Sequence, residues 1–373
     1  MTPDDRRDPA EHTTTTSEPE GAEQVATRRR IGKVLVRALI MAVGLVVAGV
    51  ALTFAFEDIT LSEVVDAIRG LDDAETIALV AGTVGVIWAE ALLTASVVEG
   101  LPARRGALAW LGPTAVASVI PGPSDMPLRY RMFGSWGYDA ATAGTAVGAG
   151  ALLNIGLKLV LPAIAGIGIA VADIPLEGFF STIVTGAVML GVFLGAAAYV
   201  LGTEQRTAAA GRALDRIWNP TLRLLRRERS GPALADRLVN LRERSLEQLR
   251  SRWPYSVASL GLVTVTRVSL FVMCIRFAGV PEDAAGWPAI FCVWAIVRGL
   301  TLIPIMPGNA GVSELAFVGM LAPIAGTGYV NQVTAGVLLF RLLTWLLLIP
   351  VGGLAIGLWQ LGLRRAESAS AAD

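Results

Sequence analysis

Long apolar stretches separated by short polar segments dominate this chain of 373 residues. Unbroken apolar runs of about 20 residues are long enough to cross the hydrocarbon core of a membrane as α-helices. The expected full spans are 31–56, 77–99, 138–172, 177–201, 254–280 and 331–361. The pattern therefore predicts an all-α integral membrane protein built as a polytopic helical bundle.

Two further apolar regions, 106–136 and 288–328, are interrupted by proline and glycine. Proline ends or kinks a helix, so neither region predicts one straight span. The interrupting residues are Pro113 and Pro121–Asp125 in the first region, and Pro304, Pro307, Gly308 and Gly311 in the second. Each region predicts a broken or re-entrant helical hairpin. The alternative is that both arms of each hairpin cross the membrane completely.

Basic residues outside the spans set the orientation. They cluster at 28–33, 104–105, 202–253 and 364–365. Lysine and arginine accumulate on the cytoplasmic side of a bacterial inner membrane. All clusters are cytoplasmic if hairpin 106–136 enters from the cytoplasm and hairpin 288–328 from outside. The expected parts are a cytoplasmic tail 1–30, a membrane half 31–201, cytoplasmic basic amphipathic helices 202–253, a membrane half 254–362 and a cytoplasmic tail 363–373.

The tips of the two hairpins are similar in sequence. Ile120–Asp125 and Met306–Gly311 each place a Pro-Gly pair between apolar arms, and the two halves have opposite orientations. Inverted repeats with broken helices near the membrane midplane are typical of secondary transporters. The pattern therefore predicts two inverted repeats. Helix packing is expected at the GxxxG spacings Gly144/Gly148, Gly191/Gly195 and Gly353/Gly357.

Composition supports the membrane class and removes several kinds of chemistry. Hydrophobic residues make up 54% of the chain and charged residues 17%, against about 25% charged residues in soluble domains. The single histidine, His12, lies in the polar N-terminal tail, and Cys274 and Cys292 lie in apolar runs without metal-ligand spacing. We expect no catalytic triad, no metal, no cofactor and no nucleic-acid partner.

Charged residues inside the apolar regions are the candidate functional residues. A charge at the bilayer centre costs about 2.5–3.5 kcal/mol on insertion scales, so these side chains must face a polar interior, pair, or reach an interface. They are Glu90, Asp125, Arg129, Lys158, Arg267, Arg298, Glu314 and Arg341. Cations outnumber acids in this set, and a phosphate group would complete the balance because arginine offers it a planar fork of donors. Half-helix N-termini at the hairpin tips would also favour an anion.

Structural interpretations of the same charges stay open. Asp125 and Arg129 are four residues apart and can pair on one helix. Glu90 is either a proton-coupling group or the partner of a nearby arginine. Arg267 and Arg276 can extend to the interface.

The two tip motifs, 121–129 with Asp125 and Arg129, and 307–314 with Gly311 and Glu314, resemble the transmembrane region of the lysylphosphatidylglycerol synthase family. That region is the flippase half of the bacterial multiple peptide resistance factor. The resemblance covers roughly 31–362 and includes a late arginine, Arg341. Departures lie at Ser124 and Asn309, where the family prefers glycine, and at Asn154 and Lys158, where it has an acid–arginine pair.

The resemblance implies lipid translocation rather than lipid synthesis, because no room remains for a soluble aminoacyl-transferase domain after the last span. The expected function is a flippase that moves a phosphate-bearing lipid headgroup through a polar intramembrane cavity. The expected substrate-binding residues are Asp125, Arg129, Lys158, Asn309, Gly311, Glu314 and Arg341. Glu90 is the expected coupling residue, and Arg267 and Arg298 are further intramembrane charges.

The expected partners are membrane lipids, either anionic or aminoacylated phospholipids or polyprenyl-linked lipids. A homo-oligomer and a cytosolic lipid-synthesis enzyme remain open as further partners. Three alternative functions also stay open at this point: an intramembrane lipid-linked glycosyl or acyl transferase, a transporter of a small soluble solute, and a non-transporting membrane partner of a cytosolic synthase.

Overall fold

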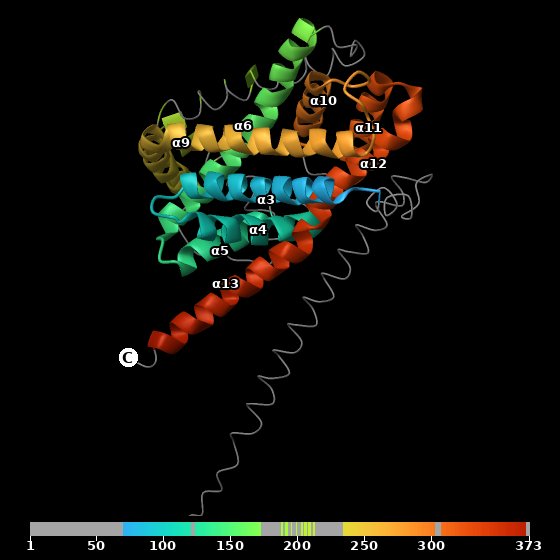
Figure 1. The fold of residues 1–373 in the computed structure, drawn as a ribbon. Coiled ribbons are helices and arrows are strands. Elements are labelled where there is room, and N and C mark those ends of the chain that lie inside the picture. The colour runs from blue at the N-terminus through green and yellow to red at the C-terminus, as the bar shows by residue number, and fades with distance from the viewer. Residues whose placement is uncertain are drawn as a thin grey trace, which may run out of the picture. The chain divides into compact units, whose positions relative to one another are not determined.

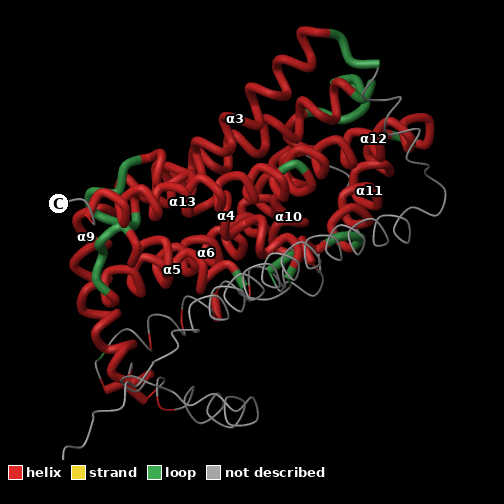
Figure 2. The backbone as a smooth tube through the Cα atoms, turned by 90° about the horizontal axis from the view of Figure 1, so that it is seen from below, coloured by secondary structure: helices red, strands yellow, loops and turns green. Residues whose placement is uncertain are grey.

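A computed structural model gives the fold of the chain (Figure 1). It describes residues 70–120, 124–172, 234–302 and 307–370, with a few positions between 188 and 212. These residues belong to one compact unit, Ala48–Asp373. Their regular structure is entirely helical, which confirms the all-α prediction (Figure 2). The expected tail 1–30, the span 31–56 and most of 177–233 lie outside the described residues.

Within the described part, four helices are long and apolar enough to cross a membrane: Asp73–Ser96, Ala140–Ile169, Arg252–Phe277 and Thr327–Ala366. The first is α3 (Asp73–Ser96), and the second belongs to α6 (Ala140–Ala172). The third is the end of α9 (Leu234–Phe277), which continues without a break from the arginine-rich segment. The protein is therefore a multi-pass membrane protein, as the sequence predicts.

The sequence marks the start of α3 clearly. Asp72 is the N-cap residue, and its Oδ1 accepts a hydrogen bond from the Glu75 backbone N–H at 2.6 Å. The Glu75 carboxylate in turn accepts the Asp72 backbone N–H at 3.1 Å. This capping box satisfies backbone donors that have no partner within the helix. Polar caps of this kind place the first turn of α3 at a polar boundary.

The two interrupted regions form pairs of short helices. Region 106–136 contains α4 (Ala103–Val119) and α5 (Asp125–Ser135), and region 288–328 contains α10 (Trp287–Leu300) and α11 (Val312–Ala325). With 17, 11, 14 and 14 residues, all four fall short of the length of about 20 residues that a span requires. The arms pack against each other in each pair.

Helices α9, α3, α4 and α13 (Leu348–Ser370) are neighbours in that order (Figure 1). Neighbouring helices of this row approach each other closely where one of them has a glycine. A Cβ at Gly106 of α4 would lie 2.4 Å from the Ala91 carbonyl oxygen of α3, and one at Gly352 of α13 would lie 2.4 Å from the Leu111 carbonyl oxygen of α4. Helix α6 packs against α10 on the other side of the bundle.

These packing glycines are not the ones that the GxxxG spacing selects. A Cβ added at Gly144, Gly191, Gly195, Gly353 or Gly357 would meet nothing within 4 Å. Among the described residues, no atom therefore packs closely against these five glycines, and helix packing at the three GxxxG pairs stays a prediction.

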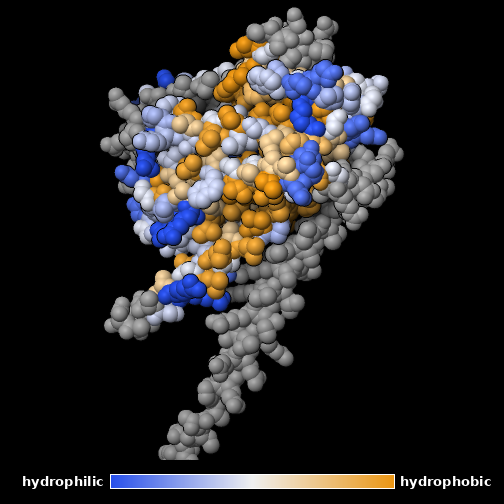
Figure 3. Space-filling view, in the orientation of Figure 1, coloured by the Kyte–Doolittle hydropathy of each residue, from blue (hydrophilic) through white to orange (hydrophobic). Residues whose placement is uncertain are grey.

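Large apolar side chains also cover the outside of the bundle. On α3 they form one stripe, Ile77, Val80, Val84 and Trp88, which are 69%, 56%, 45% and 50% exposed. Figure 3 shows apolar side chains gathered over the middle of the helix row and hydrophilic ones toward its two ends. An apolar exterior band between polar ends is what a lipid-facing surface requires.

Candidate functional site

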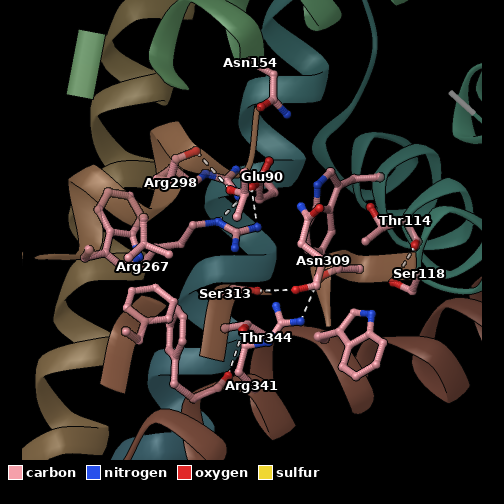
Figure 4. A pocket seen from close by; sticks show the side chains of 18 residues that line it. Glu90, Thr114, Ser118, Asn154, Arg267, Arg298, Asn309, Ser313, Arg341 and Thr344 are labelled. Atoms are coloured by element: carbon pink, nitrogen blue, oxygen red, sulfur yellow. Dashed lines mark hydrogen bonds and ion pairs between the residues drawn. The ribbon is translucent and has the colours of Figure 1, made fainter. Parts of the chain in front are cut away.

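A cavity of about 230 Å³ lies inside the bundle, between α3, α4, α6, α9, α10 and α11, and α12 (Val330–Arg341) closes it together with the turn that follows (Figure 4). Its charged lining residues are Glu90, Arg267, Arg298 and Arg341. The uncharged polar lining residues are Thr114, Ser118, Asn154, Thr301, Asn309, Ser313 and Thr344. Aromatic rings of Trp110, Trp294, Phe317, Phe340 and Trp345 complete the wall. Apolar helices therefore enclose a cavity with a largely polar lining.

Glu90 of α3 and Arg267 of α9 face each other on one wall (Figure 4). The Glu90 Oε1 accepts hydrogen bonds from the Arg267 Nε at 3.1 Å and from a terminal nitrogen at 2.7 Å. Both side chains are mostly shielded from solvent. The pair compensates two charges that neither helix could bury alone, and it links two neighbouring spans. Glu90 is thus the partner of an arginine, and its coupling role stays a prediction.

Arg341 at the end of α12 anchors the opposite wall. Its Nε lies 2.5 Å from the Oε1 of Glu314, a carboxylate that is 0% exposed, and a terminal nitrogen donates to the Gly308 carbonyl oxygen at 2.7 Å. The short 3₁₀ turn η2 (Pro307–Asn309) presents that carbonyl. It does so because Gly308 and Asn309 both take left-handed backbone angles, with φ of 58° and 53°. Asparagine is among the few residues other than glycine that adopt such angles readily.

An irregular helical turn follows Arg341. Residues Leu342–Leu346 form a π-helical turn, η4, in which the Leu347 N–H reaches back to the Leu342 carbonyl oxygen at 2.8 Å. π-helical turns are rare in proteins, and many of those that occur lie at functional sites. The turn carries Trp345, whose ring lies 5.0 Å from the Arg341 guanidinium carbon, within cation–π range. A Cβ at Gly308 would lie only 2.0 Å from the Trp345 Nε1, so this position accepts glycine alone.

Two lining donors have no partner in the described structure. They are the Nε of Arg298 on α10 and the Nε1 of Trp345, and both atoms are buried. A buried polar group without a hydrogen bond costs about 1–3 kcal/mol, so these two donors are an energetic cost beside the cavity. With three arginines and one glutamate on its wall, the cavity fits an anion.

The sequence profile of the family described as "Lysylphosphatidylglycerol synthase TM region" matches residues 41–352. The chain belongs to this family. No curated protein matches the chain. The family and the membrane-spanning helices together fit a membrane function related to lipids, and the cavity lies within the matched residues.

The structure brings several of the predicted residues of this family member together. Glu90, Arg267, Arg298, Asn309 and Arg341 all line the cavity. Glu314 lies behind Arg341 and holds it, without lining the cavity itself. Lys158 of α6 does not line the cavity itself. Its Nζ donates to the carbonyl oxygen of Thr301, a lining residue, at 2.8 Å. Gly311, with φ of 82°, is the N-cap residue of α11 and positions that helix.

Asp125 and Arg129 do not line the cavity. They pair with each other at 3.4 Å along α5, and the Arg129 Nε donates to the Ala109 carbonyl oxygen of α4 at 3.2 Å. The local pairing that the i,i+4 spacing allows is therefore present. These contacts hold the two arms of the first hairpin together. The tip residues 121–123 lie outside the described residues.

Sequence reasoning missed Trp345, Thr114, Ser118, Ser313 and Thr344 as lining residues. Thr114 and Ser118 are four residues apart on α4 and so share one face, which is a usable signal in an apolar helix. Nothing comparable in the sequence marks Ser313 and Thr344. They can be recognised as lining residues only when the positions of the neighbouring helices are known. Trp345 looks like one more apolar residue in a hydrophobic run, and its place beside the Arg341 guanidinium depends on the π-helical turn.

Proposed function

We propose that this protein is a flippase that moves a phosphate-bearing lipid headgroup across the bacterial inner membrane. The headgroup passes through the cavity while the hydrocarbon chains stay in the bilayer. The observation that carries the proposal is the cavity itself, which three arginines and one glutamate line, and Arg298 among them forms no ion pair with a carboxylate of the described chain. A phosphate oxygen is the acceptor that such an arginine binds best.

The residues in and around the cavity have different proposed roles. Arg298 and Arg341 bind the phosphate, and Arg267 adds positive potential from the opposite helix. Lys158 raises that potential through its position behind Thr301. Glu314 orients Arg341, and Asn309 offers an amide at the second hairpin tip. Asp125 and Arg129 keep the first hairpin closed, and Glu90 is the coupling residue.

The proposed topology has two inverted halves, each with a re-entrant hairpin, and both termini in the cytoplasm. The short paired helices α4–α5 and α10–α11 support it, because arms of this length reach only part of the way across a bilayer. Helix N-termini at the hairpin tips then lie near the midplane, where they favour an anion. Substituted cysteines at Ser124 and Asn309 that react with polar reagents from opposite sides would support this topology.

A lipid is the better substrate than a free solute for two reasons. The cavity volume of about 230 Å³ lies below the range of about 300–1,000 Å³ that is usual for whole small-molecule ligands. It therefore suits a headgroup whose remaining bulk stays outside. The family also contains lipid-related membrane regions. An enzyme would need an acid–base pair at the substrate, whereas Glu90 is the one carboxylate among the described lining residues.

The test is translocation of fluorescent phospholipids in proteoliposomes, read as the fraction of label that an external reductant reaches with time. We expect Arg298→Ala to slow translocation by roughly tenfold or more, which corresponds to about 1.4 kcal/mol. Arg364→Ala is the matched control, because Arg364 is exposed near the end of α13 and does not line the cavity. Equal rates for wild type and Arg298→Ala would overturn the proposal.

A further inference from the structure

The tip of the second hairpin is held by two side chains from one segment of the chain. Arg341 donates to the Gly308 carbonyl oxygen at 2.7 Å and pairs with Glu314 in the first turn of α11. Trp345, four residues later, packs on the same glycine. The ring atoms closest to a Cβ placed at Gly308 are Nε1, Cε2 and Cδ1, at 2.0, 2.5 and 2.6 Å. The N–H edge of the indole ring therefore lies directly against the tip.

This arrangement leaves one donor and one acceptor without partners. The Trp345 Nε1 and the Glu314 Oε2 are both buried, and neither forms a hydrogen bond within the described chain. Such groups are rare in native structures, because each has lost its hydration without gaining a partner. Both side chains contact the Arg341 guanidinium, through the cation–π contact at 5.0 Å and through the ion pair. They therefore lie within side-chain reach of each other, and a turn of the indole ring would let the donor meet the acceptor.

The position of the tip prevents that rotation. The ring cannot turn while the tip turn η2 lies against its N–H edge, so the tip has to move first. On its other side η2 contacts α4. Gly308 and Asn309 of the tip line the cavity together with Ser313 of α11. Movement of the tip away from Trp345 would therefore change the shape of the cavity wall.

We propose that the second hairpin tip is a latch with two positions and that Trp345 switches between them. In the described position, the indole ring packs on Gly308 and Arg341 binds the tip carbonyl. In the second position the tip has left the ring, the Trp345 N–H donates to the Glu314 Oε2, and the Gly308 carbonyl oxygen faces the cavity. Each position pairs polar groups that the other leaves unpaired, which keeps the two close in free energy. The use of this movement in transport rests on the proposed function, whereas the two positions do not.

Hydrogen–deuterium exchange of the full-length protein in detergent tests the latch without any transport. The readout is the exchange rate of the backbone amides at 308–315, which cover the tip and the first turn of α11. Trp345→Phe keeps an aromatic ring and removes the N–H that stabilises the second position. We expect this variant to slow exchange at the tip roughly fivefold or more, as the loss of one hydrogen bond from the second position requires. Its melting temperature should rise, because a buried donor without a partner is gone from the described position.

Trp359→Phe is the matched control. Trp359 is also buried on the last helix, but its Nε1 already donates to the Ser135 Oγ at 2.9 Å. Loss of this N–H should lower the melting temperature and leave exchange at the tip unchanged. The latch would be overturned by a Trp345→Phe protein that exchanges at the tip as fast as wild type, or that loses thermal stability as Trp359→Phe does.

A second variant acts in the opposite direction. Gly308→Ala places a methyl group against the N–H edge of the indole ring, so it should separate the ring from the tip and speed up exchange there. Gly326→Ala is its control, because Gly326 at the end of α11 has φ of 93° and nothing within 4 Å of an added Cβ. It introduces similar backbone strain without the clash and should leave the tip unchanged. Equal exchange at the tip in Gly308→Ala and wild type would contradict the latch.

Translocation in proteoliposomes separates the latch from the proposed function. If both are correct, Trp345→Phe slows lipid translocation together with exchange at the tip. Slower exchange with translocation as fast as wild type would leave the latch intact and refute its use in transport. A wild-type protein that moves no lipid, yet shows the expected exchange differences, would refute the flippase and leave the latch intact.

Discussion

Arg341 reaches from the end of α12 to Glu314 in the first turn of α11, and the two side chains form an ion pair at 2.5 Å around a fully shielded carboxylate. The same guanidinium binds the Gly308 carbonyl oxygen. One arginine on the cavity wall thus ties the end of α12 to the tip turn η2 and to the first turn of α11. A buried ion pair of this kind is expensive to break because it leaves an uncompensated charge.

Removal of either member of this pair should destabilise the protein strongly. We expect Glu314→Ala and Arg341→Ala each to cost about 3–5 kcal/mol, because each leaves the other charge buried and alone. The double variant should cost clearly less than the two single values added together. Unfolding in detergent measures these free energies. Additive single effects would show that the pair is not coupled.

Neutralisation of Glu90 should separate energy coupling from structure. In Glu90→Gln the amide oxygen can still accept from Arg267, so we expect α3 and α9 to stay paired while the proton-binding group is lost. Translocation in proteoliposomes should then no longer respond to a pH gradient. Glu99→Gln, an exposed carboxylate just after α3, is the control. A full gradient response in Glu90→Gln would remove Glu90 as the coupling residue.

Glycines at the helix crossings should be intolerant of the smallest substitution. Gly106→Ala and Gly352→Ala would place a methyl group 2.4 Å from a carbonyl oxygen, so we expect a loss of about 1–3 kcal/mol from overpacking. Gly357→Ala meets nothing within 4 Å and should be neutral or stabilise by up to about 1 kcal/mol through helix propensity. Melting temperatures in one detergent compare the three variants. A Gly106→Ala protein as stable as Gly357→Ala would contradict the packing.

The loop after α9 should make stability depend on acid pH. The Trp287 backbone N–H and the Arg276 guanidinium lower the pKa of Glu282 below its ordinary value. A carboxylate with a lowered folded-state pKa stabilises the protein above its unfolded pKa, and this contribution is lost as the pH falls through the folded pKa. We therefore expect wild type to lose more thermal stability on acidification than Glu282→Gln. Parallel pH profiles for the two proteins would contradict this.

The sequence predicted the membrane class and the described spans because hydrophobic length and proline are local signals. It also singled out most of the charged wall, since Glu90, Arg267, Arg298 and Arg341 stand out by charge alone in apolar helices. Charge alone did not predict which of these basic residues lie in the same cavity. Arg129 looked equivalent to Arg341, yet it is used to bind the Ala109 carbonyl oxygen within the first hairpin.

Long-range geometry decided the remaining features. Gly106 and Gly352 are packing positions only because α3 and α13 cross α4 there, and the more regular pair Gly353/Gly357 faces no neighbour. Trp345 lies beside the Arg341 guanidinium because of an irregular turn that no hydrophobic period reveals. Left-handed angles at Asn309 likewise follow from its place at a tip between two helices. These are properties of the assembled bundle rather than of any single segment.

The π-helical turn Leu342–Leu346 has a consequence for how this sequence can change. It acts as one residue inserted into a continuous helix, and the wider turn absorbs the extra residue, so Gly352 still faces Leu111 beyond it. Removal of one residue from this turn would restore regular winding and leave nearly the same face toward α4. Removal of one residue between this turn and Gly352 would instead rotate everything beyond it by about 100°. A change of one residue in chain length is therefore tolerated at the turn and not in the regular helix that follows it.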